Sequence, residues 1–238
     1  MADRIQFDGK EKTILYTDNP EQVIIRFKDV TTAFGGIKRA RLKDKGICCN
    51  TVSSILFKTL EDAGVPTHFI SKVSDREQLC RRVGLIPLQI IVRNRLAGTT
   101  AELLGVDVGK RILNPVYEIR LNDDNLHDPM INRTHATALG IVTEDEMDTM
   151  LRIARRVNEV LSAFLLKAGI ELVDFKMECG RLADGTIILS DELSPDNTRL
   201  WDITDGRCLD KDRFRRDMSD VTATYKEVMN RLLKIASI

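Results

Sequence analysis

Ionisable side chains alternate with apolar ones along "VDFKMEC", residues 173–179. Asp174, Lys176 and Glu178 occupy every second position of this run. Side chains of a β-strand point alternately to its two faces, so an extended conformation places all three ionisable groups on one face. The run "GTIILSDE" follows, and the Asp184-Gly185 dipeptide between the two runs predicts a β-hairpin. This face of the strand is either a solvated surface or part of a functional site.

The predicted hairpin brings two carboxylates together. If Asp184 and Gly185 are the two turn residues, Glu178 lies opposite Asp191, with about 5 Å between their Cβ atoms. Two carboxylates at that distance repel, so one is protonated, or Lys176 neutralises them, or a divalent cation lies between them. Oxygen ligands without histidine suit Mg²⁺, which proteins commonly hold with one or two carboxylates and substrate phosphates. The chain has only 3 histidines, which excludes a histidine-rich metal site.

Glycines beside lysines are the candidate phosphate sites. The sequence contains neither GxxxxGK[ST] nor GxGxxG, the two common phosphate-binding motifs. In "FDGKEKTILY", Lys10 and Lys12 follow Gly9, and Gly35-Gly36 precede several basic residues. Such stretches are either solvated basic loops or phosphate cradles. Together with the carboxylate pair they predict an ATP site, with lysines on the phosphates and carboxylates on Mg²⁺.

Three further segments carry candidate substrate contacts. In "VRNRLAGTT", Arg93 leaves an apolar strand and needs either an anionic substrate or a structural carboxylate as partner, and Thr99 lies where a helix N-terminus could bind an anion. In "LNDDNLHDP", Asp128 and its acidic neighbours either bind substrate or form the turn before Pro129. In "DELSPDNTRLWD", a single guanidinium, Arg199, accompanies four carboxylates. The acids after Asp191, which are Glu192, Asp196 and Asp202, are expected to be solvated turn formers or partners of arginines.

The elements that must position these groups begin with strands. A hairpin spans "KEKTILYT" and "EQVIIRFK", a helix covers residues 50–64, a strand covers 67–74, a short helix 75–84 and a buried strand 85–98. Thr143 and Glu146 form a capping box for a long helix that ends at Gly169. An amphipathic helix runs from about residue 211. This order predicts an α+β fold with antiparallel sheets, and a boundary near Gly84–Pro87 divides the chain into residues 1–84 and 85–238.

Composition narrows the class of protein. Lys plus Arg and Asp plus Glu are 36 each among 238 residues, so no net charge favours nucleic acid or an acidic membrane. No run approaches the ~18 apolar residues of a membrane span, and the N-terminus has no apolar segment typical of a secretory signal. The 5 cysteines are odd in number and lack a CxxC motif. We therefore expect a cytoplasmic protein without structural zinc.

Six segments, in order from about residue 7 to 230, resemble the SAICAR synthetase family in its bacterial single-function form. They are "GKEK", "VRNRLAGT", "HDPMIN", "LVDFKMECG", "DELSPDNTRLWD" and "KDRFRR". The resemblance implies ATP-dependent ligation of a phosphoribosyl aminoimidazole carboxylate (CAIR) with L-aspartate, giving SAICAR, ADP and phosphate in purine biosynthesis. It also implies an antiparallel N-terminal lobe and a larger C-terminal α/β lobe with an ATP cleft between them, distantly like protein kinases and ATP-grasp enzymes. A kinase-like phosphotransferase using the same cleft is the alternative.

The resemblance also implies roles for individual residues. Lys10 and Lys12 would bind ATP phosphates, and Glu178 and Asp191 would bind ATP through Mg²⁺. Arg93, Thr99, Asp128, Arg199 and Arg215 would bind the substrates, and Asp174 and Lys176 would be the catalytic residues. ATP, CAIR and L-aspartate would be the small-molecule partners, and the protein would be a homodimer or larger homo-oligomer. Three positions depart from the family pattern: Thr99 replaces the usual Ser, Gln89 a common Glu, and Asn122 a frequent Lys.

Overall fold

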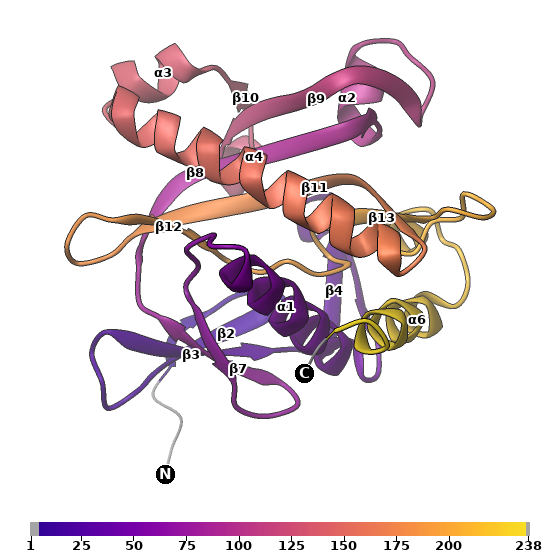
Figure 1. Cartoon of the computed structure of the whole chain (residues 1–238), viewed down its shortest axis with the longest axis horizontal. Coiled ribbons are helices and arrows are strands. Elements are labelled where there is room, and N and C mark those ends of the chain that lie inside the picture. Colours follow the sequence, from indigo (N-terminus) through magenta and orange to yellow (C-terminus); the bar gives the residue numbers. More distant parts are fainter. Residues whose placement is uncertain (1–4, 237–238) are drawn as a thin grey trace.

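The computed structural model describes residues 5–236, which form two antiparallel sheets with helices around them (Figure 1). The first sheet has the strand order β1-β2-β3-β7-β6. Its strands are β1 (Ile5–Asp8), β2 (Lys12–Tyr16), β3 (Gln22–Phe27), β6 (Phe69–Lys72) and β7 (Glu77–Arg81). The predicted N-terminal hairpin is confirmed, because β2 and β3 pair antiparallel on either side of the Asp18–Pro20 turn.

The second sheet is larger and follows the order β10-β9-β8-β11-β12, with β13 also paired to β11. Its strands are β8 (Gly84–Leu96), β9 (Lys110–Leu121), β10 (Met130–Ile131), β11 (Ile170–Arg181), β12 (Ile187–Ser190) and β13 (Thr198–Asp202). These strands pair antiparallel, so the predicted α+β class is confirmed. A separate hairpin of β4 (Val30–Ala33) and β5 (Lys38–Arg41) carries the Gly35-Gly36 turn.

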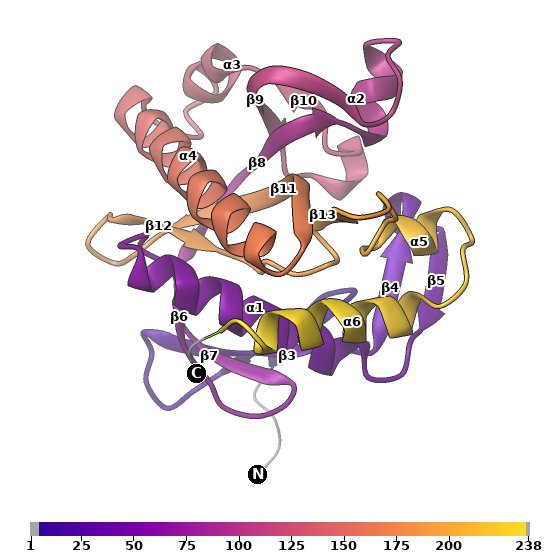
Figure 2. The same cartoon turned by 45° about the vertical axis from the view of Figure 1, so that its right-hand side comes forward.

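Three long helices pack between and around the sheets. They are α1 (Lys45–Asp62), α4 (Glu144–Lys167) and α6 (Val221–Leu233). α1 contacts both α4 and α6, and Figure 2 shows α6 lying alongside it. The short helices are α2 (Gly98–Leu103), α3 (Arg133–Ala138) and α5 (Asp212–Arg215).

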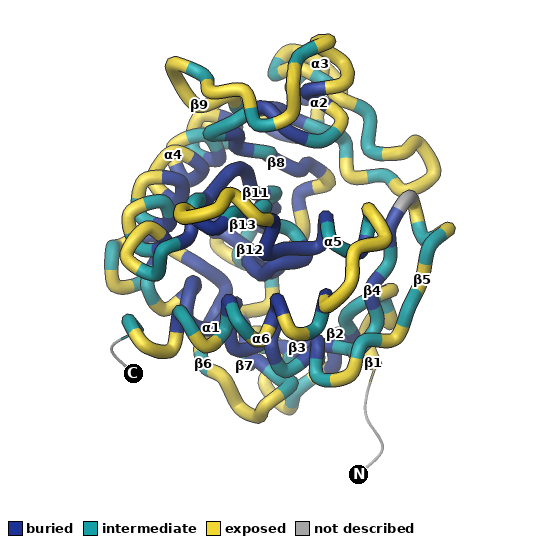
Figure 3. The backbone as a smooth tube through the Cα atoms, turned by 90° about the vertical axis from the view of Figure 1, so that its right-hand side faces the viewer, coloured by how far each residue is buried: buried dark blue, intermediate teal, exposed yellow. Residues whose placement is uncertain are grey.

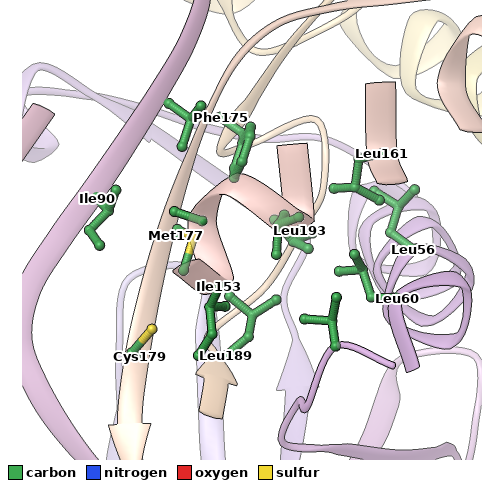
Figure 4. Close-up of a cluster of buried hydrophobic side chains, with 14 of the residues drawn as sticks. Leu56, Leu60, Ile90, Ile153, Leu161, Phe175, Met177, Cys179, Leu189 and Leu193 are labelled. Carbon is green, nitrogen blue, oxygen red and sulfur yellow. The ribbon is translucent and has the colours of Figure 1, made fainter. Parts of the chain in front are cut away.

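The main hydrophobic core lies where α1 and α4 meet the larger sheet. Figure 4 shows its side chains, among them Leu56 and Leu60 of α1, Ile153 and Leu161 of α4, and Met177 and Leu189 of the sheet. A second apolar cluster joins α6 to the first sheet through Val221, Tyr225, Val23 and Ile25. The C-terminal helix therefore stabilises the N-terminal sheet. Figure 3 shows the result, with β11 and β12 buried and much of the outer face of α4 exposed.

The long helix α4 begins as the sequence predicts. Thr143 Oγ1 accepts a hydrogen bond from the Glu146 N–H (3.1 Å), and the Glu146 carboxylate accepts one from the Thr143 N–H (2.9 Å). The same carboxylate binds Arg181 at the end of β11 (2.6 Å), so the cap also ties the helix to the sheet. Gly169 follows the helix in the left-handed conformation (φ 71°), which a glycine adopts without a steric penalty.

Two predicted helices are wrong. Residues 77–81 form the strand β7, with Gln78 and Cys80 buried at alternate positions, because pairing with β3 and β6 outweighs the helical propensity of this segment. The C-terminal segment is two helices, α5 and α6. The break between them contains Asp217 and Asp220, both in the left-handed conformation (φ 56° and 63°), which no α-helix accommodates.

No helix within the described residues 5–236 is both long enough and apolar enough to span a membrane.

Candidate active site

A cleft of about 1200 Å³ lies between the two sheets. Strands β2 and β3 and the Gly35-Gly36 turn line one side, and β8, β11 and the segment after β12 line the other. The cleft brings together every site residue that the sequence predicts, from positions more than 200 residues apart. These residues are Lys10, Lys12, Arg93, Thr99, Asp128, Asp174, Lys176, Glu178, Asp191, Arg199 and Arg215.

The floor of the cleft is one face of the larger sheet. Asp174, Lys176 and Glu178 of β11 all line the cleft, so the predicted shared face is confirmed. Their partners across the ladder to β8 are Arg93, Ile91 and Gln89, which line it too. The face therefore carries a row of opposite charges and hydrogen-bonding groups over an apolar core on its far side.

The predicted hairpin register is wrong by one residue. Glu178 pairs with Ser190 rather than with Asp191, because the turn holds three residues and Leu182 N–H donates to the Thr186 carbonyl (2.9 Å). A one-residue slip in a regular strand moves a side chain to the opposite face. The side chain of Asp191 is not moved to the opposite face, because Asp191 follows the last residue of β12 and adopts the left-handed conformation (φ 67°). Its carboxylate therefore still lines the cleft.

The two carboxylates have opposite pKa shifts. Burial and the negative charge of Asp191 raise the pKa of Glu178, although Lys176 lies 3.3 Å away. Burial also opposes ionisation of Asp191, but Lys12 and Lys176 hold the pKa of Asp191 below its usual value. Lys12 forms ion pairs with Asp191 and with Glu192 (2.9 Å), and these carboxylates overcome its burial and raise its pKa. A charged lysine thus lies directly beside the candidate metal ligands.

Lys10 lies in a different environment from Lys12. Its side chain is half exposed and pairs with Asp124, an exposed residue, at 2.8 Å. Asp124 belongs to the loop after β9 that also contains Asp128, and both residues line the cleft. The pair thus joins the glycine-lysine segment to the opposite side of the cleft mouth. A weak, solvated ion pair of this kind separates at little cost when a ligand enters.

The acids after Asp191 are buried, contrary to the solvated alternative of the prediction, while the other alternative, partnership with an arginine, is confirmed for Asp202. Glu192, Asp196 and Asp202 are only 5%, 7% and 5% exposed. Asp196 pairs with Lys45 and accepts a hydrogen bond from the Tyr225 hydroxyl (2.8 Å), and together these groups keep its pKa low despite burial. Asp202 takes a different partner and pairs with Arg231 of α6. Asp196 therefore anchors α1 and α6 to the loop after β12, and Asp202 anchors α6 to the end of β13.

Lys45 is a buried cation that the sequence analysis did not identify as a candidate, since it lies in an ordinary basic stretch. It is 1% exposed and reaches Asp196, the Val30 carbonyl (2.9 Å) and Glu11 (3.6 Å). Glu11 separates Lys10 from Lys12 in the sequence and also pairs with Lys211 (2.7 Å). This network connects the glycine-lysine segment, α1 and the acidic loop, and so fixes the two walls of the cleft relative to each other.

Lys45→Met is expected to lower the free energy of unfolding by about 3–5 kcal/mol, because it leaves buried carboxylates without their cation. Urea denaturation followed by circular dichroism measures this loss. Lys58→Met on the same helix is the matched control, since Lys58 pairs with Asp62 at the surface, both 62% exposed. The control should change stability by less than about 0.5 kcal/mol. Equal, small losses in the two variants would contradict the role given to Lys45.

Arginines and carboxylates form a second network deeper in the substrate side of the cleft. Arg93 pairs with Glu118 and with Asp174 (2.7 Å), so its partners in this structure are carboxylates of the protein. Arg199 also binds Asp174 (2.8 Å) and, through Nε, Asp212 (2.8 Å). Arg215 pairs with the same Asp212. Two shared carboxylates therefore hold three guanidinium groups in fixed positions, which favours binding of an anionic substrate.

Arg120 is a cleft residue that the sequence analysis missed. It comes from β9, its guanidinium donates to the Asp128 carbonyl (3.2 Å) and lies 3.4 Å from Thr99 Oγ1, and its buried Nε has no partner among the described residues. It therefore joins two predicted substrate residues. The occurrence of Glu118, Arg120 and Asn122 at every second position of the sequence could have identified it.

The two departures from the family pattern at positions 89 and 122 contact each other. The Gln89 side-chain amide donates to Asn122 Oδ1 (2.7 Å), and both residues line the cleft. A neutral amide pair therefore occupies the two positions at which the resemblance implies a Glu and a Lys. The net charge of the cleft is unchanged by the exchange, because it removes one negative and one positive group.

Asp210 is a fully buried carboxyl next to the arginine network. It accepts hydrogen bonds from the N–H groups of Leu200 (2.8 Å) and Asp212 (2.8 Å). Burial and the negative charge of Asp212 raise the pKa of Asp210 from 3.8 to about 6. The folded state therefore binds this proton more tightly than the unfolded chain does.

A raised carboxyl pKa stabilises the fold at low pH, and this contribution is lost as pH rises from about 4 to about 6. The loss amounts to at most about 3 kcal/mol for a shift of about two pKa units. Asp210→Asn cannot titrate, so its free energy of unfolding should fall less than that of the unsubstituted protein between pH 4 and 6.5. Urea melts across this range measure the difference between the two proteins. Parallel curves would contradict the raised pKa.

Comparison with known proteins places these residues in a family. The sequence profile described as SAICAR synthetase matches residues 6–232. A phosphoribosylaminoimidazole-succinocarboxamide synthase of Clostridium botulinum (strain Eklund 17B / Type B) is 47% identical over 228 residues, which are 96% of this chain and 97% of the relative.

Two solved structures are also similar to this chain along nearly their whole length. The synthase of the same name from Ehrlichia chaffeensis has a TM-score of 0.94 at 38% identity, covering 96% of this chain and 98% of that one. A SAICAR synthetase in complex with ADP has a TM-score of 0.93 at 40% identity, covering 98% and 99% of the two chains.

Proposed function

The chain belongs to the SAICAR synthetase family in its bacterial single-function form, and we propose that one side of its cleft binds ATP and the opposite side binds CAIR and L-aspartate. The enzyme is an ATP-dependent C–N ligase of purine biosynthesis, which joins CAIR to L-aspartate and releases SAICAR, ADP and phosphate. The observation that carries the proposal is the convergence of all eleven predicted residues on one cleft between two sheets.

The N-terminal side of the cleft is the proposed nucleotide site. Ile14, Val23 and Ile25 of the first sheet line the cleft there, as do Val83 and Leu85 at the beginning of β8. A flat base fits between such surfaces. Lys12 and Lys10 would bind the phosphates, Lys12 more strongly because it is the more deeply placed of the two. ADP in the similar solved structure supports a nucleotide in this fold.

The donor set at the end of β11 and β12 fits Mg²⁺. Glu178 and Asp191 supply carboxylate oxygens, and the Oγ of Ser190, the ladder partner of Glu178, is buried without a partner among the described residues. Oxygen donors of this kind are typical of magnesium sites. Here five carboxylates lie among four ammonium groups, so a further cation is electrostatically favoured. The carboxylates are those of Glu11, Glu178, Asp191, Glu192 and Asp196, and the ammonium groups are those of Lys12, Lys45, Lys176 and Lys211. Bound Mg²⁺ would neutralise phosphoryl oxygens during transfer.

The opposite side of the cleft is the proposed site for CAIR and aspartate. Arg199, with Thr99 and Arg120, would bind the substrate phosphate or carboxylate, and Arg215, which also lines the cleft, would bind the carboxylates of aspartate. Asp128 lies beside Arg120 and would contact the amino or ribose groups of CAIR. Arg93 and Asp174 are both paired with charged groups of the protein, so their proposed role is to orient other residues. In place of the predicted catalytic role, Asp174 would hold Arg93 and Arg199 in position.

The residue types match a reaction through an activated carboxylate. The CAIR carboxylate attacks the γ-phosphorus of ATP to form an acyl phosphate and ADP. The amine of aspartate then attacks the carbonyl carbon, loses a proton and expels phosphate. Lys176 lies between the phosphate side and the substrate side, where its ammonium would stabilise the charge that develops on the oxygens of the transferred group. No covalent intermediate with the protein is needed.

Release of ADP with each substrate omitted in turn tests this function. The ligase requires both CAIR and L-aspartate for sustained ADP release, whereas a kinase-like phosphotransferase needs no amine. A coupled ADP assay should therefore give full rates only with both substrates present. Undiminished ADP release without aspartate would favour the phosphotransferase.

Three further proposals concern the whole molecule. We propose residues 1–84 as the nucleotide lobe and 85–238 as the substrate lobe, with α6 returning to pack against the first. The protein is proposed to form a homodimer or larger homo-oligomer, in support of which apolar side chains at Leu103, Leu113 and Val116 are exposed. A cytoplasmic location is supported by the 5 cysteines, which are all buried and free.

A further inference from the structure

The hairpin of β4 and β5 lies beside the short helix α5, and Figures 2 and 3 show the two elements together. The turn of this hairpin contains Gly35 and Gly36, which line the cleft on its N-terminal side. Lys38 is the first residue of β5 and pairs with Ala33 across the turn. Among residues 5–236, Lys38 is not one of those that line the cleft, so it can affect the site only through its contacts with other parts of the protein.

The ammonium group of Lys38 binds the C-terminal end of α5. It donates a hydrogen bond to the Phe214 carbonyl, pairs with Asp217 (2.6 Å) and lies 4.6 Å from the centroid of the Phe214 ring. The Asp217 side chain is 86% exposed, so the ion pair by itself is weak. Phe214 is buried, however, and the face of its ring attracts a cation. These contacts of one ammonium group therefore join α5 to the hairpin.

The other end of α5 is bound to the same side of the cleft. Lys211, directly before the helix, pairs with Glu11 (2.7 Å), whose carboxylate also accepts a hydrogen bond from the N–H of Thr32 in β4 (2.7 Å). A helix of 4 residues is not stable by itself, so contacts of this kind determine where it lies. Elements of the N-terminal side thus hold α5 at both of its ends.

The residues of α5 itself belong to the substrate side of the cleft. Asp212 binds Arg199 (2.8 Å) and also pairs with Arg215, and both arginines line the cleft. The carbonyl that Lys38 binds is part of the peptide bond between Phe214 and Arg215, which is a rigid planar unit. A displacement of this carbonyl therefore moves the backbone of Arg215 with it.

We propose that Lys38 is a positioning residue for the aspartate site: its ammonium group fixes the end of α5 against the β4–β5 hairpin and so holds Arg215 in place. The inference rests on the proposed function, in which Arg215 binds the carboxylates of aspartate. Lys38 takes no part in the chemical steps. Its effect should therefore appear in the use of aspartate and not in the binding of the nucleotide.

The first test is the variant Lys38→Met, which keeps the packing over the Phe214 ring but removes the charge. The value of kcat/KM for L-aspartate at saturating ATP and CAIR should fall about 10–100-fold, mainly through KM, because a small displacement of a binding group has effects of this size. The affinity for ADP should stay within about twofold. Arg39→Met is the matched control, because Arg39 is exposed on the opposite face of the same strand, and it should leave the KM for aspartate unchanged. An unchanged KM for aspartate in Lys38→Met would overturn the inference.

A double-mutant cycle with Arg215→Met tests whether Lys38 acts through Arg215. If it does, Lys38→Met combined with Arg215→Met should lose no more kcat/KM for aspartate than Arg215→Met alone, within about twofold. A double loss equal to the product of the two single losses would show that the residues act independently, and would overturn the inference. If Arg215→Met leaves the KM for aspartate unchanged, the proposed aspartate site itself fails, and the inference fails with it.

The conservative variant Lys38→Arg separates positioning from a general loss of structure. An arginine keeps both the charge and the N–H donors, so its KM for aspartate should lie within about threefold of that of the unsubstituted protein. A loss as large as that of Lys38→Met would contradict the role given to the charge. Circular dichroism should show the same fold in all variants, because the Lys38 side chain is 24% exposed. Should Lys38→Met not fold, Lys38→Gln, which is uncharged and shorter, takes its place in the cycle with the same criteria.

Discussion

Asp191→Asn is expected to lower kcat about 10³-fold while the protein keeps its fold and its melting temperature within a few degrees. The amide keeps the size of the side chain but removes the negative charge that would bind Mg²⁺ and that pairs with Lys12. Binding of metal-free ADP should change little, because the phosphates would then be held by lysines alone. Steady-state rates at saturating substrates, together with ADP titration calorimetry with and without Mg²⁺, measure both effects.

Asp184→Asn is the matched control, because Asp184 lies in the exposed turn of the same hairpin and its side chain only accepts from the Thr186 N–H (2.9 Å). Asparagine makes the same turn contact, so kcat should be unchanged. Near-normal turnover of Asp191→Asn at saturating Mg²⁺ would refute the metal assignment for this residue.

Lys12→Met should lower kcat/KM about 10²–10³-fold, mainly through the nucleotide. Lys12 is the cation nearest to the two predicted metal ligands on the N-terminal side, and its pairs with Asp191 and Glu192 keep it charged in the cleft. A methionine of similar length keeps the packing but leaves the phosphoryl oxygens without that charge. The variant should also lose stability, since Asp191 and Glu192 then repel each other without a counterion.

Lys10→Met provides the comparison for Lys12→Met. Lys10 is half exposed and, among residues 5–236, pairs only with exposed Asp124, so solvent screening should limit its effect on kcat/KM to about tenfold or less. Initial rates as a function of ATP concentration separate the two variants. A larger loss in Lys10→Met than in Lys12→Met would mean that the phosphates lie nearer the mouth of the cleft than we propose.

Much of the site could be predicted because it depends on local rules. The two-residue period of a strand is sufficient to put Asp174, Lys176 and Glu178 on one face, and the structure confirms it. The ladder to β8 then places Arg93 next to Asp174, a contact that needs the long-range pairing of two strands about 80 residues apart. A sequence pattern therefore predicts the shared face of β11, but it does not predict the contact between Arg93 and Asp174.

The errors come from features that depend on tertiary contacts. The length of the β11–β12 turn differs by one residue from the commonest type, and the left-handed conformation of Asp191 compensates for the resulting shift. No sequence pattern predicts two such departures that cancel. Glu192 and Asp196 look like a solvated loop because their partners, Lys12 and Lys45, come from the other end of the chain. The strand at 77–81 looks helical for the same reason, since its neighbours β3 and β6 decide its conformation.

The position of the metal is the most direct test of the proposed site. Crystals grown with ADP and Mn²⁺ in place of Mg²⁺ would show the ion by its anomalous scattering. We predict a single peak about 2.0–2.3 Å from carboxylate oxygens of both Glu178 and Asp191 and from phosphate oxygens of the nucleotide. A peak coordinated by Asp174 or Asp128 instead, with Glu178 and Asp191 bound only to lysines, would contradict this account.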